Sequence, residues 1–318
     1  MTPSEVRVVF MGSPAFAVPS LRALADTGYD LVAVVTQPDR PAGRGGAVKP
    51  PEVKVAALAL GLEVLQPETL KDAAIQQQLR ETRADVFVVA AYGKILPRAV
   101  LEMPARGSLN VHASLLPRWR GASPIAAAIL AGDAETGVSI MELVQKMDAG
   151  PVVLRKTAPI EIGDTTGSLE PRLAELGAGA LVEALPGWYE RRIVPQSQDE
   201  ALVTYCRTLT KEDGHLRQGM TAAEAERAVR AYNPWPVAHV LYEGQRLAIW
   251  RAHVADVGGG AGGPEPGALT IIERAPAVVF SDRALVLDEV QREGGKRLTG
   301  RDFVNGLRGK IAARIELA

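Results

Sequence analysis

The sequence predicts an α/β fold, with a parallel sheet in its first part and a small β-barrel in its last third. Three continuous apolar runs, 6–11, 31–36 and 85–91, indicate strands buried on both faces, since they lack the alternation of a half-solvated sheet. Stretches with helical spacing separate these runs, as in βαβ units. Beyond residue 237 the apolar runs become short and closely spaced, which is typical of a barrel.

The first domain begins with the strand Val6–Met11, the helix Ala15–Ala25 and the strand Leu31–Thr36. Gly12 opens the turn between strand and helix, but this turn lacks the G-x-G-x-x-G spacing that binds a dinucleotide pyrophosphate. A dinucleotide site is therefore not expected, and we assign Gly12 to close packing.

The composition of residues 37–51 differs from that of the strands and helices around them. The segment contains four prolines, three glycines and the cationic residues Arg40, Arg44 and Lys49. Proline lacks a backbone donor, so this segment is predicted to be neither helix nor central strand. A loop of this length inside a compact domain is either functional or a mobile solvent loop, and composition alone favours neither.

Between residues 52 and 208 helical and apolar patterns continue to alternate. They predict helices at Val53–Leu60, Asp72–Arg80, Ser123–Ala131 and Thr165–Tyr189, and a short helix or turn at Pro97–Met103. The predicted strands are Glu63–Leu65, Asp85–Ala91, Leu109–Val111, Val138–Leu143 and Pro151–Ala158. The last two strands lie too close in sequence for a crossover helix, so we expect them to pair antiparallel. Residues 190–208 are predicted to link two domains, 1–189 and 209–318, because the segment opens with a polar, non-periodic run.

The second domain opens with a capping box, Thr221 to Glu224, at the start of a helix that Asn233-Pro-Trp-Pro236 ends. Five short strands follow, and Arg301–Leu307 is predicted as a closing helix. The strands are Ala238–Tyr242, Arg246–Val254, Ala268–Ile272, Ala277–Phe280 and Ala284–Val290.

Composition argues against several classes of protein. A net charge of -1 does not suit a protein that coats nucleic acid or membranes by bulk charge, so a nucleic-acid role needs a local patch. The one cysteine, Cys206, indicates a reducing compartment and is assigned as a small buried residue. Four histidines and one cysteine make no zinc cluster. With no recognised signal peptide and no run of membrane-spanning length, we expect a cytoplasmic protein without a membrane partner.

The stretch 108–122 carries the strongest functional signal. Asn110 lies within the strand Leu109–Val111 and His112 directly follows it, two residues on, so both polar side chains are expected on one face of the sheet. Ser114 begins a tight turn that leaves the strand, and we assign it a role in that turn. Residues 118–121 form a basic, aromatic loop. A lone histidine is more often a core residue, with its hydrogen bonds made to neighbouring groups, than a functional one. An amide, an imidazole and this loop within fifteen residues favour an active site instead.

The chemistry that fits is direct acyl transfer to an amine, because no Ser or Cys nucleophile stands beside the histidine as in a triad hydrolase. The Asn110 amide can donate to the oxyanion of a tetrahedral intermediate, and His112 can donate to it or relay a proton. Asp148, in the bend 144–150, can fix the imidazole tautomer and raise its basicity. Local sequence alone favours a simpler alternative, in which Asp148 makes its own turn. None of these steps needs a metal.

Five segments together resemble the methionyl-tRNA formyltransferase family, in order over both domains. They are 37–45, 91–97, 108–124, 137–150 and 233–236. Asn110, His112 and Asp148 alone mark the wider formyltransferase superfamily. The arginine-rich loop and the Asn-Pro-Trp-Pro element narrow the resemblance to the enzymes that act on tRNA.

The resemblance implies a Rossmann-like catalytic domain that binds 10-formyltetrahydrofolate, and an OB-like C-terminal domain that helps bind initiator methionyl-tRNA. It implies Asn110, His112 and Asp148 as the catalytic set, and Arg40 and Arg44 as residues that approach the tRNA acceptor stem. The implied folate contacts are Tyr92, Gly93, Ser114, Leu115, Leu116 and Pro117. We expect a monomer that needs no metal.

The sequence departs from the family pattern at two places. Gly46-Ala47-Val48 stands where lysines are frequent, and Ala113 stands where glycine is frequent. The expected reaction is formyl transfer from the folate to the α-amine of methionine on initiator tRNA. Two alternatives stay open: a formyltransferase acting on a small amine, and a non-catalytic folate- or RNA-binding module, which would not need the polar trio.

Overall fold

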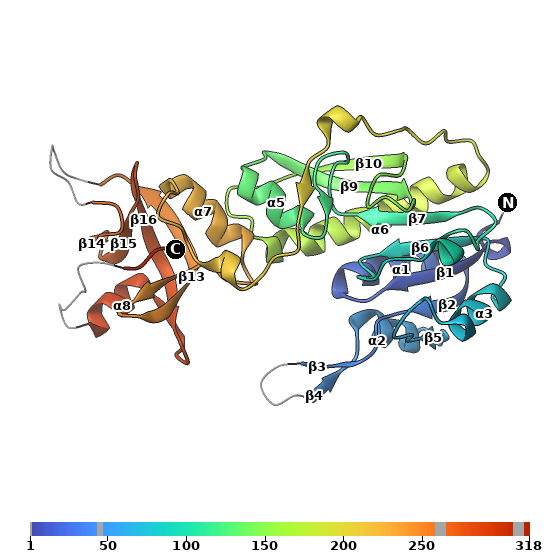
Figure 1. Ribbon diagram of the computed structural model, residues 1–318, viewed down its shortest axis with the longest axis horizontal. Coiled ribbons are helices and arrows are strands. Elements are labelled where there is room, and N and C mark those ends of the chain that lie inside the picture. The colour runs from blue at the N-terminus through green and yellow to red at the C-terminus, as the bar shows by residue number, and fades with distance from the viewer. Residues whose placement is uncertain (1, 43–46, 258–264, 308–314) are drawn as a thin grey trace. The chain divides into compact units, whose positions relative to one another are not determined.

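The computed structural model describes residues 2–42, 47–257, 265–307 and 315–318, and Figure 1 shows their secondary structure as ribbons. The chain divides into two compact units. The first comprises 1–124, 135–159 and 170–206, and the second comprises 125–134, 160–169 and 207–318.

The first unit is built on a seven-stranded sheet in the order β10-β9-β7-β6-β1-β2-β5 (Figure 1). The strands are β1 (Arg7–Gly12), β2 (Asp30–Val35), β5 (Val64–Leu65), β6 (Val86–Ala90), β7 (Ser108–His112), β9 (Glu135–Glu142) and β10 (Val152–Pro159). The five from β5 to β7 in this order are parallel, whereas β9 pairs antiparallel with both β7 and β10. The expected Rossmann-like, mostly parallel sheet and its antiparallel pair are confirmed.

The strand order reverses at β1, because the chain builds β2 and β5 on one side of it and then returns to place β6 and β7 on the other. In open parallel sheets, ligands bind at the carboxyl ends of strands beside such a reversal. Those ends are Gly12, Ala90 and His112. A Cβ on Gly12 would stand 2.8 Å from the Ala90 carbonyl oxygen, which confirms that Gly12 serves close packing.

Helices cover both faces of this sheet. The helices are α1 (Val18–Thr27), α2 (Glu52–Ala59), α3 (Ala73–Glu81), α4 (Arg98–Leu101) and α6 (Thr166–Tyr189), and α5 (Pro124–Ala131) begins in the same unit. On one face of the sheet, Val9 of β1 and Val89 of β6 belong to a buried cluster that includes Leu79 of α3 and Val100 of α4. On the opposite face α6 packs closely, since a Cβ on Gly177 would lie 2.7 Å from Val111.

The segment 37–51, expected as a loop, contains a hairpin at its base. Strands β3 (Arg40–Ala42) and β4 (Ala47–Lys49) pair antiparallel in a sheet of their own. A two-stranded sheet consists of edges alone, and edges are where proline is tolerated. Residues 43–46, Arg44 among them, lie outside the described residues.

The segment expected to be a linker, 190–208, is bonded to the first unit as far as Cys206. Val152 and Gln196 exchange both of their backbone hydrogen bonds. Strand β11 (Tyr205–Cys206) pairs in parallel with β8 (Arg120–Gly121). The segment therefore belongs to the structure of this unit, because its backbone groups are satisfied there.

The second unit contains a curled antiparallel sheet in the order β12-β13-β16-β15-β14, with β17 paired to β16. Its strands are β12 (His239–Tyr242), β13 (Gln245–Ala255), β14 (Leu269–Ile272), β15 (Ala275–Val279), β16 (Ala284–Arg292) and β17 (Arg297–Thr299), and its helices are α7 (Ala222–Ala231) and α8 (Gly300–Gly306). The five expected strands, the capping box of Thr221 and the closing helix are confirmed, and β17 is an addition. Across the described ranges, no helix is both long and apolar enough to cross a membrane.

Candidate active site

Strand β7 places Asn110 and His112 on one face of the sheet, as their spacing predicts. Asn110 is paired with Val89 of β6 and with Met141 of β9, and His112 is paired with Ser139. Val111 faces the other side, against α6, and is 2% exposed. Burial of the apolar residues of β7 thus fixes the direction in which the two polar side chains point.

Side-chain hydrogen bonds hold the turn that follows β7. Ser114 Oγ donates to the Arg118 carbonyl over 2.7 Å, which confirms the turn role expected of Ser114. Ser139 Oγ donates to the Ser114 carbonyl over 2.7 Å and accepts from the Leu116 N–H over 3.1 Å. These bonds fasten residues 114–118 to β9, beside His112.

A backbone carbonyl sets the tautomer of His112. Nε2 of His112 lies 3.0 Å from the carbonyl oxygen of Trp119. A carbonyl can only accept, so Nε2 carries the hydrogen of the neutral ring and Nδ1 carries the lone pair. We expected Asp148 to fix the tautomer. The structure corrects this assignment, because the Trp119 carbonyl does so.

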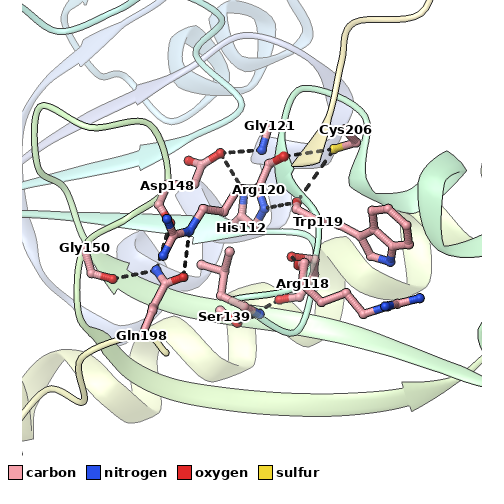
Figure 2. Close-up of polar contacts among 12 residues, drawn as sticks. His112, Arg118, Trp119, Arg120, Gly121, Ser139, Asp148, Gly150, Gln198 and Cys206 are labelled. Atoms are coloured by element: carbon pink, nitrogen blue, oxygen red, sulfur yellow. Dashed lines mark hydrogen bonds and ion pairs between the residues drawn. The ribbon is translucent and has the colours of Figure 1, made fainter. Parts of the chain in front are cut away.

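Asp148 lies beside the free nitrogen of the imidazole, as Figure 2 shows. Its Oδ2 is 3.9 Å from His112 Nδ1 and accepts a 2.8 Å hydrogen bond from the Gly121 backbone N–H. The two side chains are only 7% and 14% exposed, so water screens their interaction weakly. The alternative in which Asp148 makes its own turn is wrong, because its donor is 27 residues away.

Gly121 can donate to Asp148 because it has no side chain. Its φ is +120°, and a Cβ would collide with the Cys206 carbonyl on β11. Any larger residue would push β8 away from β11 and move the N–H donor away from Asp148.

The amide of Asn110 is half-buried on the same face as His112. Within the ranges that the structure describes, no group forms a hydrogen bond with this amide. Its two N–H donors can therefore bind a substrate oxygen. The structure thus gathers Asn110, His112 and Asp148, which the sequence spreads over 39 positions.

Two further residues complete the site, and the sequence analysis did not identify them (Figure 2). Arg120, expected in a basic loop, is fully buried and donates through Nε to Gln198 Oε1 over 2.9 Å. Gln198 Nε2 in turn donates to the carbonyls of Asp148 and Gly150, over 2.8 Å and 2.7 Å. The Arg-Trp-Arg run was a visible signal, but nothing in its sequence shows which arginine is buried.

The residues expected to contact a folate divide by their exposure. Tyr92 and Leu116 are each 1% exposed, and their side chains belong to core clusters. Burial raises the pKa of Tyr92 to about 12. Ser114 is fully buried as well. These three side chains support the site from within.

The other three expected folate contacts reach the surface. Leu115 and Pro117 are half-buried in the turn after β7, and Gly93 is exposed just beyond the end of β6. These three are the more exposed of the six residues, and all six folate contacts stay predictions.

Arg40 has the exposure that a tRNA contact requires. Its side chain is 63% exposed, and a guanidinium nitrogen lies 3.6 Å from a carboxylate oxygen of Glu68, which is 76% exposed. Exposed pairs of this kind are weak, so Arg40 can exchange Glu68 for a phosphate. Arg44 lies outside the described residues.

Cys206 does not have the surroundings of a nucleophile. Its Sγ donates to the carbonyls of Trp119 and Arg120, and burial raises the pKa of its thiol. Cys206 is thus no nucleophile, as expected, but it is half-buried and not fully buried as its assignment predicted. Among the described residues, no three His, Cys, Asp or Glu side chains are grouped so that they could hold a metal ion.

Two family models match the chain. One is described as formyl transferase and matches residues 6–185, and the other as formyl transferase, C-terminal domain, and matches residues 208–308. The methionyl-tRNA formyltransferase of Methylobacillus flagellatus is 47% identical over 302 residues, which cover 95% of this chain and 96% of the relative. That of Pseudomonas putida is 44% identical over 308 residues, which cover 97% of this chain and 98% of the relative.

Solved structures share the fold at low sequence identity. WlaRD, a sugar 3N-formyl transferase crystallised in the presence of dTDP and 5-N-formyl-THF, has a TM-score of 0.66 at 16% identity, over 90% of this chain and 97% of that one. HypX from Aquifex aeolicus, in complex with tetrahydrofolic acid, has a TM-score of 0.62 at 16% identity, over 99% of this chain and 51% of that one.

Proposed function

The chain belongs to the methionyl-tRNA formyltransferases, and from that premise we propose that Asn110, His112 and Asp148 carry out its reaction. The enzyme transfers a formyl group from a folate co-substrate to the free amino group of methionine on initiator tRNA. We assign 10-formyltetrahydrofolate as the donor. One observation supports this site above all: a free amide, an imidazole nitrogen with a lone pair and a carboxylate share the edge where strand ends bind ligands.

Asn110 stabilises the charge that develops on the formyl oxygen. The neutral amine of methionine attacks the formyl carbon, a C–N bond forms, and the carbonyl electrons move to the oxygen. An amide N–H donated to that oxyanion contributes about 3 kcal/mol, or a hundredfold or more in rate. The Asn110 amide has no competing partner within the described chain, so it meets the oxyanion without first breaking a bond.

His112 carries the proton from the attacking amine to the leaving group. Nδ1 accepts the proton that the amine loses, and the imidazolium is then held between the Trp119 carbonyl at Nε2 and the Asp148 carboxylate at Nδ1. The bond between the formyl carbon and N10 of the folate breaks next. N10 receives the proton from Nδ1, tetrahydrofolate leaves, and His112 returns to its neutral tautomer.

The remaining contacts follow from exposure. In this proposal Gly93, Leu115 and Pro117 touch the folate, while Tyr92, Ser114 and Leu116 support that surface from behind. Arg40 and Arg44 bind phosphates of the acceptor stem. A net charge of -1 permits this, because phosphate binding needs only local cations.

In this proposal residues 1–189 form the catalytic domain, extended by the segment up to Cys206 that is bonded to it, and residues 209–318 form an OB-like domain that holds the tRNA. The enzyme works as a monomer in the cytoplasm and requires no metal.

The test is a turnover assay of the full chain with formylfolate and two acceptors, initiator and elongator methionyl-tRNA. We expect efficient formylation of the initiator and much slower formylation of the elongator. Equal rates with both tRNAs would contradict selection of the initiator. Efficient transfer to a small amine at similar kcat/KM would contradict tRNA as the acceptor.

A further inference from the structure

A short segment after α6 lies beside the site and carries polar side chains that the reaction scheme does not use. We call residues 196–206 the strap. At one end Gln196 exchanges two backbone hydrogen bonds of 2.8 Å with Val152, and at the other β11 pairs with β8. Both ends of the strap are thus fixed to elements that border the site.

Gln198 is the strap residue that reaches Asp148. Its Nε2 donates to the carbonyls of Asp148 and Gly150, over 2.8 Å and 2.7 Å, and its Oε1 accepts from Arg120 Nε over 2.9 Å. Carbonyls only accept and a guanidinium only donates, so these three partners permit a single orientation of the amide. Every strong hydrogen-bonding position of the Gln198 side chain except one lone pair is in use.

Arg120 fixes the position of Gln198 in turn. It is fully buried, and a terminal nitrogen donates to Glu200 Oε1 over 2.9 Å. Glu200 also accepts from Lys146 over 2.8 Å. Arg120 is therefore held by two residues of the strap, and a buried guanidinium with fixed partners has little freedom to move.

Asp148 needs such support because its backbone is in an uncommon conformation. Its φ is +48°, in the left-handed region that is uncommon outside glycine, although aspartate adopts it more readily than most residues. Gly121 holds its carboxylate and Gln198 holds its carbonyl, so the residue is fixed at both ends.

We propose that Gln198 is a positioning residue for formyl transfer. Anchored by Arg120, it holds the 148–150 backbone so that the Asp148 carboxylate stays beside His112. This inference rests on the proposed role of Asp148, and the strap acts only through that residue.

Gln198→Glu tests the proposal, with Gln196→Glu as its matched control. The new carboxylate can still accept from Arg120, but it has no N–H to donate and it repels the two carbonyls. Gln196→Glu makes the same change of charge two positions earlier, where the side chain lies 3.5 Å from Arg155 and the backbone makes the anchoring bonds. We expect Gln198→Glu to lower kcat by about 30- to 100-fold, since a misplacement of about 1 Å costs about that much. KM for tRNA and folate should stay within about threefold, and Gln196→Glu should stay within about twofold of wild type in kcat.

A second variant, Gln198→Met, removes the hydrogen bonds at similar size without adding charge, and the same fall in kcat is expected. All variants are assayed at a temperature where thermal unfolding shows them folded. The proposal is overturned if both Gln198 variants keep kcat within about threefold of wild type, if Gln196→Glu falls equally, or if KM alone rises. It is also overturned if neither Gln198 variant folds, because the residue then serves stability.

Asp148→Asn, assayed in parallel, separates this inference from the proposed function. Wild-type turnover of the Asp148→Asn variant would rule out the proposed catalytic role of Asp148, and with it the basis of this inference. Loss of turnover in Asp148→Asn with normal Gln198 variants would remove the role of the strap alone.

Discussion

Replacing Asp148 with asparagine removes one charge from the site while keeping a side-chain oxygen that the Gly121 N–H can reach. In the native protein the carboxylate oxygen lies 3.9 Å from His112 Nδ1. Two unit charges at this separation attract by about 4 kcal/mol when the effective dielectric constant is about 20. In the proposed mechanism, the imidazolium that forms on His112 during transfer loses this attraction in the variant. Because about 1.4 kcal/mol corresponds to a factor of ten in rate, kcat should fall by about 100- to 1000-fold.

The assay is single-turnover formylation of methionyl initiator tRNA at saturating folate, with tRNA affinity measured separately by filter binding. Asp26→Asn on α1 is the control, because it makes the same change of charge at an exposed residue far along the chain from the site. We expect the control to match wild type and the Asp148→Asn variant to bind tRNA normally. A variant that keeps kcat within about threefold, or that loses tRNA affinity at unchanged turnover, would refute the electrostatic role of Asp148.

Four other perturbations test the remaining assignments, three of them from the structure and the last, at Arg44, from the family resemblance. His112→Ala removes the side chain that we propose carries the proton, so kcat should fall about a hundredfold or more at near-normal tRNA affinity, and normal turnover would contradict its role. Tyr92→Phe deletes a buried hydroxyl that has no hydrogen-bond partner within the described chain. Urea denaturation should therefore show a free energy of unfolding higher by about 1 kcal/mol at unchanged activity, whereas a higher KM for folate would indicate that the hydroxyl contacts the folate. The hydrogen bond from the Arg207 side chain lowers the pKa of Asp213 from 3.8 to about 2, so its carboxylate stabilises the fold above about pH 4 and loses this effect as the pH falls through about 2. Asp213→Asn should therefore lower stability by about 1 kcal/mol at pH 7, and thermal unfolding should show the deficit shrinking toward pH 2. Arg44→Ala should raise KM for tRNA more than KM for folate, and an unchanged tRNA KM would exclude the loop from recognition.

Patterns that act over a few residues led directly to the right elements. The alternation of Leu109, Asn110, Val111 and His112 predicts one polar and one apolar face, because side-chain direction in a strand depends only on position along it. The capping box of Thr221 is equally local, since its two hydrogen bonds span three residues. The hairpin at 40–49 was missed because prolines and glycines predict turns without saying whether short strands pair around them.

Contacts between distant segments were beyond such patterns. Local sequence favoured a turn role for Asp148, whereas its carboxylate accepts from Gly121 and its carbonyl accepts from Gln198, 50 residues further along. The polar run that includes Gln198 looked like a linker, and the Arg-Trp-Arg run looked like an exposed basic loop, although Arg120 is fully buried.

By itself, the sequence determined the order of the main helices and strands, the face shared by Asn110 and His112, and the residue types of the candidate site. Only the tertiary structure decided that the Trp119 carbonyl faces the imidazole and that Arg120 is bonded to Gln198, which in turn is bonded to the Asp148 carbonyl. The physical reason is that periodicity reports which side of its own element a residue occupies. It does not report which distant segment packs against that side. That depends on the loops that bring elements far apart in sequence together, and the free energy of closing them is set by the whole unit.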